Sequence, residues 1–175
     1  MDDVYVVECA TTGDKGFPYN KVVQIAICKM HKDGTDFDTV YDSFVSVDPL
    51  DIGKDGLDHL QEHYGITAET LYAAPDEEFV IKEVFSKLSG TECTSFNVNY
   101  TFGKFLCVEP WDLNRELTML PSISSRLDLE FSKDLLMAYE HYNPGNPMEV
   151  TGRTAMDRCL MSLSLMMLLR RNGML

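Results

Sequence analysis

An apolar run near the start of the chain, residues 4–9, constrains the fold more than any other feature. It is rich in β-branched residues and shows no alternation of polar and apolar side chains, which is typical of a strand buried on both faces. The Thr12-Gly13 pair that follows predicts a turn. Because such a strand needs a cover on each side, we predict an α/β domain with helices on both faces of its sheet.

The rest of the chain extends this prediction. Residues 21–30 and 40–47 are predicted to be two more strands, and the short turns between them indicate an antiparallel meander. A short fourth strand is expected at residues 91–96, and Thr67 is expected to cap a brief helical turn. A short helix is predicted at residues 55–64, and further helices at residues 76–88, 99–107, 127–142 and 153–171. No linker interrupts them, so residues 1–175 are expected to form one domain with a mixed sheet.

Apolar spacing predicts which helical side chains are buried. In the segment 76–88 the expected core face consists of Phe79, Val80, Val84, Phe85 and Leu88. In the segment 127–142 it consists of Phe131, Leu135, Leu136 and Tyr139. The last helix is apolar all round, which indicates burial against the sheet or a surface for assembly, with the Met-rich segment 161–167 as the candidate for the latter.

Composition limits the class of protein. The chain has 175 residues, 45% of them apolar, which suits one packed core. It contains neither an apolar run of the roughly 18–20 residues that a membrane span needs nor a basic signal flank, so we expect a cytoplasmic protein without a membrane partner. The five cysteines form no Cys-x-x-Cys pair, which predicts free thiols. The net charge of −13 disfavours nonspecific binding to duplex nucleic acid but allows a local nucleotide cleft.

The first two strands carry a recognisable pattern. Residues 8–13 read Glu-Cys-Ala-Thr-Thr-Gly, and residues 22–26 read Val-Val-Gln-Ile-Ala. They resemble the DnaQ-like (DEDDh) 3′–5′ exonucleases, in which the first strand reads Asp-x-Glu-Thr-Thr-Gly and the second Ile-Ile-Gln-Ile-Ala. The resemblance extends to about residue 169. It implies a ribonuclease-H-like α/β fold, with further strands that run parallel to the first.

Two later segments add to the resemblance. The family pattern His-Asn-Ala-x-Phe-Asp is matched by residues 96–101, which place Asn97 at the asparagine and Thr101 at a metal-binding aspartate. The family pattern His-x-Ala-x-x-Asp has a slightly shifted match at residues 152–157. There Gly152 takes the place of the general-base histidine, and Asp157 keeps the last carboxylate.

The family's reaction implies requirements that this chain meets only in part. Hydrolysis of a terminal phosphodiester uses two divalent ions held by four carboxylates, and a histidine that takes a proton from water. Here Glu8 replaces an aspartate, and Ala10 replaces a glutamate. Thr101 and Gly152 supply neither a carboxylate nor a base, so Asp157 alone is unchanged. The resemblance therefore implies either no metal or one weakly bound Mg²⁺ or Mn²⁺ between Glu8 and Asp157.

Simpler roles for these residues stay open. Glu8 is also explained as a hydrogen-bonded acid, and Asp157 as a cap of a backbone amide or a partner of Arg153 or Arg158. The resemblance makes Thr11, Thr12, Gly13 and Asn97 nucleotide-binding residues, but the first three equally form a turn, and Asn97 equally braces one. The side chains that would replace the missing groups are His141, Asp14, Asp48, Asp128 and Glu149.

Three functions are consistent with this sequence. The first is an exonuclease-like protein with an impaired site, related to the epsilon subunits of DNA polymerase III, that binds a nucleic-acid end, a nucleotide or a protein. The second is an active metal-dependent 3′–5′ exonuclease with an altered site. The third is a structural subunit that forms homo-oligomers or joins a protein partner through its apolar last helix.

Overall fold

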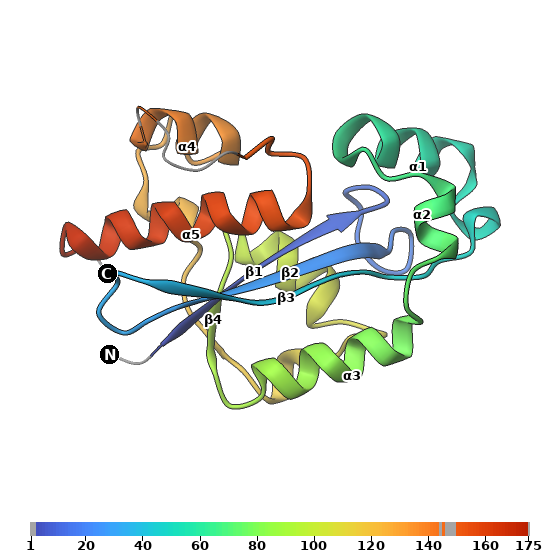
Figure 1. The fold of residues 1–175 in the computed structure, drawn as a ribbon, viewed down its shortest axis with the longest axis horizontal. Coiled ribbons are helices and arrows are strands. Elements are labelled where there is room, and N and C mark those ends of the chain that lie inside the picture. The colour runs from blue at the N-terminus through green and yellow to red at the C-terminus, as the bar shows by residue number, and fades with distance from the viewer. Residues whose placement is uncertain (1–2, 144, 146–149, 175) are drawn as a thin grey trace.

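A five-stranded mixed sheet forms the centre of the protein, for which a computed structural model describes residues 3–143, 145 and 150–174 (Figure 1). The strand order is β3-β2-β1-β4-β5. Antiparallel pairing joins β1 (Val4–Thr11), β2 (Val22–Met30) and β3 (Phe37–Phe44). The short strands β4 (Glu92–Thr94) and β5 (Thr118–Met119) continue the sheet in parallel with β1. The predicted fold class is confirmed.

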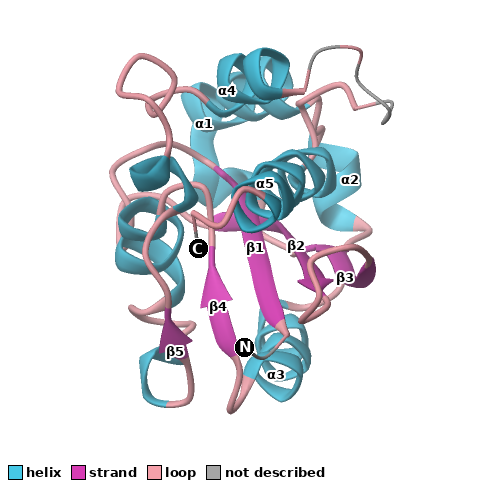
Figure 2. Cartoon of the chain, turned by 90° about the vertical axis from the view of Figure 1, so that its left-hand side faces the viewer, coloured by secondary structure: helices cyan, strands magenta, loops and turns pink. Residues whose placement is uncertain are grey.

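Helices cover both faces of the sheet (Figures 1 and 2). One face packs against α3 (Glu77–Leu88) and the π-helix η1 (Asn99–Leu106). The other packs against α5 (Ala155–Arg171), and α4 (Leu135–Tyr142) lies on the outer side of α5. Beyond the end of β1 lie α1 (Pro49–Tyr64) and α2 (Ala68–Tyr72). Short 3-10 turns occur at η2 (Leu113–Arg115) and η3 (Ile123–Arg126).

The core has two parts because β1 is buried on both sides. Val6 belongs to the apolar cluster beneath α5, and its neighbour Val7 belongs to the cluster above α3. Both side chains are inaccessible to solvent. The continuous apolar run of β1 thus contributes to both clusters, as its lack of alternation predicts.

Several predicted boundaries and core residues were wrong. The third strand begins at Phe37, and the strand β5 was not predicted. The helix expected from residue 127 begins only at Leu135, because the side chain of Asp134 accepts a hydrogen bond from the Met137 amide and caps the helix there. Phe79 and Phe85 are 55% and 41% exposed, and Leu136 is exposed as well. The fully buried residues of α3 form the narrow stripe Val80, Val84 and Leu88, and Ile81 packs beside them.

The apolar last helix is part of the core. Met161 and Met166 of α5 are buried among strand residues, so the Met-rich segment is not an exposed surface for assembly. All five cysteines are free, as predicted. Within the described residues, no helix is both long and apolar enough to cross a membrane.

Candidate functional site

Glu8, near the end of β1, is the point at which three distant segments meet. Its Oε1 accepts one hydrogen bond from the Phe96 amide after β4 and another from the Ser162 hydroxyl on α5, each 2.7 Å long. The side chain is only 3% exposed. The end of β1, the segment after β4 and helix α5 therefore meet at one place, but the carboxylate at its centre is already engaged by the protein.

Burial and charge act on Glu8 in opposite directions. Burial raises the pKa of the Glu8 carboxyl, and this effect outweighs the positive charge of Arg158 and the two hydrogen bonds, which lower it. The same charge also favours the thiolate of Cys9, although burial raises the pKa of that thiol. Arg158 therefore lies near the end of β1.

Three positions of the family's catalytic set hold neutral residues in the fold. Ala10 is fully buried in the apolar cluster beneath α5, and Thr101 is buried in η1. Gly152 adopts a positive φ of 75°, which residues with a Cβ rarely adopt. A Cβ added there would be in ordinary contact with Leu136, 3.4 Å away, so the strain arises from the backbone. A histidine at this position would be strained.

Asp157 is engaged elsewhere. Its Oδ2 accepts hydrogen bonds from the amide of Thr151 (3.0 Å) and from the Thr151 hydroxyl. It also lies near Asp42, whose pKa is raised mainly by burial, with a smaller contribution from the Asp157 charge. Gln24 links Asp42 to the first amide of α5, that of Ala155. Asp157 thus fastens the loop before α5, in keeping with the capping role considered above.

The turn after β1 is stabilised by its own polar side chains. The hydroxyl groups of Thr11 and Tyr100 are 2.8 Å apart, and the Tyr100 hydroxyl also donates to Asp14. Thr12 Oγ1 accepts from the Lys21 amide. A Cβ on Gly13 would come within 2.7 Å of the Asn20 side-chain amide, so a larger residue here would require that side chain to move.

Asn97 braces the start of η1. Its Oδ1 accepts a hydrogen bond from the Tyr100 amide, which is the bracing role that the sequence left open. The side chain is exposed, and its amide nitrogen has no hydrogen-bond partner among the described residues. The N–H groups of the Asn97 amide thus stay available next to the Glu8 junction, the place where Phe96 and Ser162 bind Glu8. Asn97 lies there because it directly follows Phe96 in the chain.

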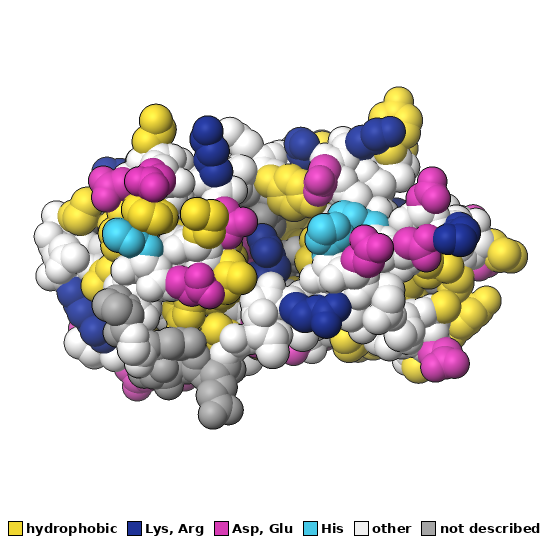
Figure 3. Space-filling model, turned by 90° about the horizontal axis from the view of Figure 1, so that it is seen from above, with side chains coloured by type: hydrophobic (Ala, Val, Ile, Leu, Met, Phe, Trp, Pro, Cys, Tyr) yellow, Lys and Arg dark blue, Asp and Glu magenta, His cyan; other side chains and the backbone are white. Residues whose placement is uncertain are grey.

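A cleft separates the turn after β1 from α1. A cavity of about 360 Å³ lies there, with Thr12, Lys21 and His59 in its lining. The Nε2 atom of His59 is buried and has no hydrogen-bond partner within the described ranges, and burial lowers the pKa of this histidine. Figure 3 shows basic side chains in the middle of this face, between α4 and α1, with histidines beside them over α1.

Arg153 joins the two sides of this face. Its Nη2 donates to the carbonyl oxygens of Gln61 (3.0 Å) and Glu62 (3.3 Å) in the last turn of α1. A cation is favourable there because the helix dipole is negative at this end. Sequence reasoning did not assign Tyr100, Arg153 or Arg158 to the site. The basic residues at the start of the last helix were the signal for two of them.

The possible replacement groups have other partners. Asp48 caps α1, Asp128 accepts from the Tyr142 hydroxyl, and Asp14 accepts from Tyr100. The ring of His141 stacks on Phe131 with centroids 3.8 Å apart. Glu149 lies outside the described residues.

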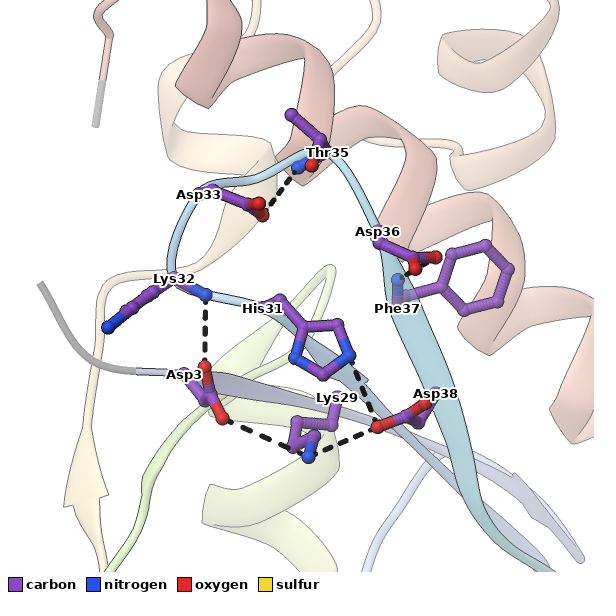
Figure 4. Close-up of polar contacts among 9 residues, drawn as sticks. All are labelled: Asp3, Lys29, His31, Lys32, Asp33, Thr35, Asp36, Phe37 and Asp38. Atoms are coloured by element: carbon purple, nitrogen blue, oxygen red, sulfur yellow. Dashed lines mark hydrogen bonds and ion pairs between the residues drawn. The ribbon is translucent and has the colours of Figure 1, made fainter.

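A second polar cluster lies at the opposite end of β1 (Figure 4). Lys29 is 3.1 Å from Asp38 and 3.8 Å from Asp3, and His31 is 3.2 Å from Asp38. The side chain of Asp33 accepts from the Thr35 amide in the adjoining hairpin. These contacts fix the hairpin between β2 and β3, far along the sheet from Glu8.

The donor set does not fit a pair of divalent ions. In residues 3–143, 145 and 150–174, no three His, Cys, Asp or Glu side chains are grouped so that they could hold a metal. Glu8 Oε1 and Asp157 Oδ2 each accept two hydrogen bonds from the protein, and Arg158 adds positive charge near Glu8. Two metal ions need several converging carboxylates to offset their mutual repulsion.

The sheet order and the converging segments define a ribonuclease-H-like fold of the DnaQ-like exonuclease type. Solved structures of DEDDh 3′-exonucleases share it. The nuclease domain of 3′hExo, a DEDDh family member bound to rAMP, has a TM-score of 0.69 at 15% identity over 98% of this chain and 93% of its own. A 3′-exonuclease that recognises the 3′ end of histone mRNA stem-loop gives the same TM-score and identity, with 83% of its own chain covered.

Larger exonucleases also contain this fold. The E. coli ExoI complex with single-stranded DNA has a TM-score of 0.64 and 13% identity over 98% of this chain, which spans 41% of that protein. Neither a family model nor a curated protein sequence matches the chain. The likeness at these identities establishes the fold.

Proposed function

We propose that this protein uses an exonuclease fold to bind a nucleotide or the end of a single-stranded nucleic acid, and that it does not cut the strand. The observation that carries the proposal is the state of Glu8. Its carboxylate is buried and accepts hydrogen bonds from Phe96 and Ser162. An acid engaged in this way serves the architecture of the cleft rather than a metal ion.

The start of α5 supports the same proposal. If the family pattern His-x-Ala-x-x-Asp is aligned on Ala155, Arg153 takes the place of the histidine and Arg158 that of the last aspartate. Arg153 is bound to the end of α1, and Arg158 places a positive charge near Glu8. A cation near a metal position repels a divalent ion. This alignment leaves none of the family's catalytic groups except the acid at Glu8.

Binding without cleavage is supported by the cleft itself. Proteins with this fold have been solved with single-stranded DNA and with rAMP. The corresponding face of this chain has an exposed amide at Asn97, a half-buried guanidinium at Arg158 and a cavity beside Thr12. Asn97 and Arg158 are a neutral and a basic donor, suited to the oxygen atoms of a nucleotide, whereas the lining of the cavity also contains Asp51 and Asp55.

Two assays on the purified chain test this proposal. Fluorescence anisotropy with short labelled single-stranded DNA and RNA measures binding, and gels of the same oligonucleotides with Mg²⁺ or Mn²⁺ measure shortening. We expect binding without shortening. Shortening that needs a divalent ion and disappears in both Glu8→Gln and Asp157→Asn would establish an active exonuclease instead. If neither an oligonucleotide nor a mononucleotide binds, the cleft has another role, such as holding a protein partner.

A further inference from the structure

We infer that Arg158 is the anchor for a phosphate group of the bound nucleotide, and that this contact replaces divalent metal ions in the cleft. The inference rests on the proposed function, because it concerns how the same site holds its ligand. When the family pattern is aligned on Ala155, Arg158 stands where the family has a metal-binding aspartate, and the inference assigns a ligand to it.

The position of Arg158 follows from the helix. Residues four apart lie on the same face of an α-helix, one turn apart. Ser162 of α5 donates to Glu8, so Arg158, one turn nearer the start of the helix, lies on the face of α5 that meets the end of β1. The effect of its charge on Glu8 and Cys9 agrees with this position.

The guanidinium of Arg158 has unused donors. Arg153 and Arg170 donate to backbone carbonyl oxygens, whereas Arg158 makes no hydrogen bond or ion pair with the described part of the chain. Its side chain is half-buried. Guanidinium groups carry five N–H donors, and removing them from water without partners is costly. A ligand oxygen in the cleft would offset that cost.

Neighbouring groups indicate the chemistry of this ligand. Asn97 offers a free amide donor next to Phe96, whose own amide binds Glu8. The Glu8 carboxylate is drawn inward by its two hydrogen bonds and is almost inaccessible, so it presents little charge to the cleft. Of the polar groups next to Glu8, Asn97 and Arg158 therefore offer donors. A phosphate, with several acceptor oxygens and a geometry that suits the guanidinium fork, fits them best.

This arrangement differs chemically from metal-mediated binding. Divalent ions bridge carboxylates and phosphate oxygens, so a chelator abolishes binding that depends on them. A guanidinium is always protonated and needs no ion. Affinity for a short single strand should therefore persist in excess EDTA, and it should depend on the charge of the linkage that Arg158 contacts.

The test uses the full chain and labelled single-stranded oligonucleotides in EDTA, with Arg158→Gln, Arg158→Lys and the control Arg171→Gln. Arg171 is an exposed arginine of the same helix, near its other end. We expect Arg158→Gln to weaken binding about 10- to 100-fold, as loss of a charge-assisted contact does. Arg158→Lys should lose less, and Arg171→Gln should bind as wild type.

A second arm needs no well-folded variant. Replacing the terminal phosphodiester of the oligonucleotide with an uncharged methylphosphonate should weaken binding to the wild type and have little further effect on Arg158→Gln. Competition by inorganic phosphate, AMP and adenosine separates the sources of the phosphate. AMP should compete best if the site holds a nucleotide, and inorganic phosphate should compete equally if it holds any phosphate.

The outcomes separate the two proposals. If wild type binds but Arg158→Gln binds equally well, or if binding disappears in EDTA, the anchor is wrong and the binding function stands. Equal affinity for the methylphosphonate oligonucleotide also refutes the anchor. If wild type binds no nucleic acid, nucleotide or phosphate, the binding function fails as well.

Discussion

Replacement of Glu8 by glutamine tests how the fold holds its buried acid. A glutamine retains a carbonyl oxygen that can accept from the Phe96 amide and the Ser162 hydroxyl, both 2.7 Å from Glu8 Oε1, but it cannot ionise. Burial raises the pKa of Glu8 above the usual 4.5 despite the opposing charge of Arg158. The folded protein therefore binds this proton more tightly than the unfolded chain does.

The expected pH dependence follows from this difference. Because the folded state binds more protons, the contribution of Glu8 to stability is fully present below pH 4.5 and is lost as the pH rises through the raised pKa. Glu8→Gln lacks this loss. Its free energy of unfolding, relative to wild type, should rise across that window and then level off. The total rise is about 1.4 kcal/mol for each tenfold difference in proton affinity between the two states.

Glu8→Ala provides the matched comparison. It leaves the Phe96 amide and the Ser162 hydroxyl without their acceptor, at about 1–3 kcal/mol each. It should therefore be about 2–6 kcal/mol less stable than Glu8→Gln at every pH. Urea unfolding at pH values on both sides of 4.5 measures all three proteins. A difference between Glu8→Gln and wild type that falls as pH rises would refute the reasoning, because the fold would then favour the ionised acid.

Three other substitutions test the structure around this site. Gly152→Ala should lower the free energy of unfolding by about 1–2 kcal/mol, measured in urea, because this position has a positive φ. The control Gly103→Ala, where the added Cβ has open space, should be neutral or slightly stabilising. Equal effects of the two substitutions would contradict the backbone assigned to Gly152. Arg153→Ala should cost about 1–3 kcal/mol and speed amide exchange at the end of α1, while the exposed Arg171→Ala should do neither; unchanged exchange would mean that the link is not formed. Tyr100→Phe should lower the free energy of unfolding by about 1 kcal/mol, and no loss would show that its hydroxyl contacts are not stabilising.

Local signals explain what the sequence predicted well. The continuous apolar run of β1 indicates a buried strand. Thr67 and Asp76 cap their helices through side-chain hydrogen bonds, and their residue types mark these helix starts in the sequence. Asp134 is also a capping residue, and its cap sets the start of α4 despite the helical spacing of apolar residues before it. The exposure of Phe79 and Phe85 could not be predicted from the sequence, because the number of α3 side chains that reach the sheet depends on how the helix packs against it.

The candidate site was predictable in outline and not in detail. The end of β1, the segment after β4 and helix α5 meet at Glu8, in the order in which the patterns occur in the chain. Which side chain of α5 faces Glu8 depends on helix phase, and a shift of one residue turns a side chain by about 100°. Asp157 and Arg158 therefore point to different surroundings although they are adjacent. The left-handed backbone of Gly152 likewise depends on the loop around it.

The contacts of Glu8 have a consequence for folding of the chain during translation. The two hydrogen bonds of Glu8 join residues that are 88 and 154 positions apart in the chain. The central strand thus lacks one of its two covers until α5 has emerged, and such distant contacts form slowly. While the intervening residues are being translated, the apolar face of strands β1–β3 that α5 will cover stays exposed to water and to other chains. Chaperones that bind exposed apolar surface therefore have a long period in which to act.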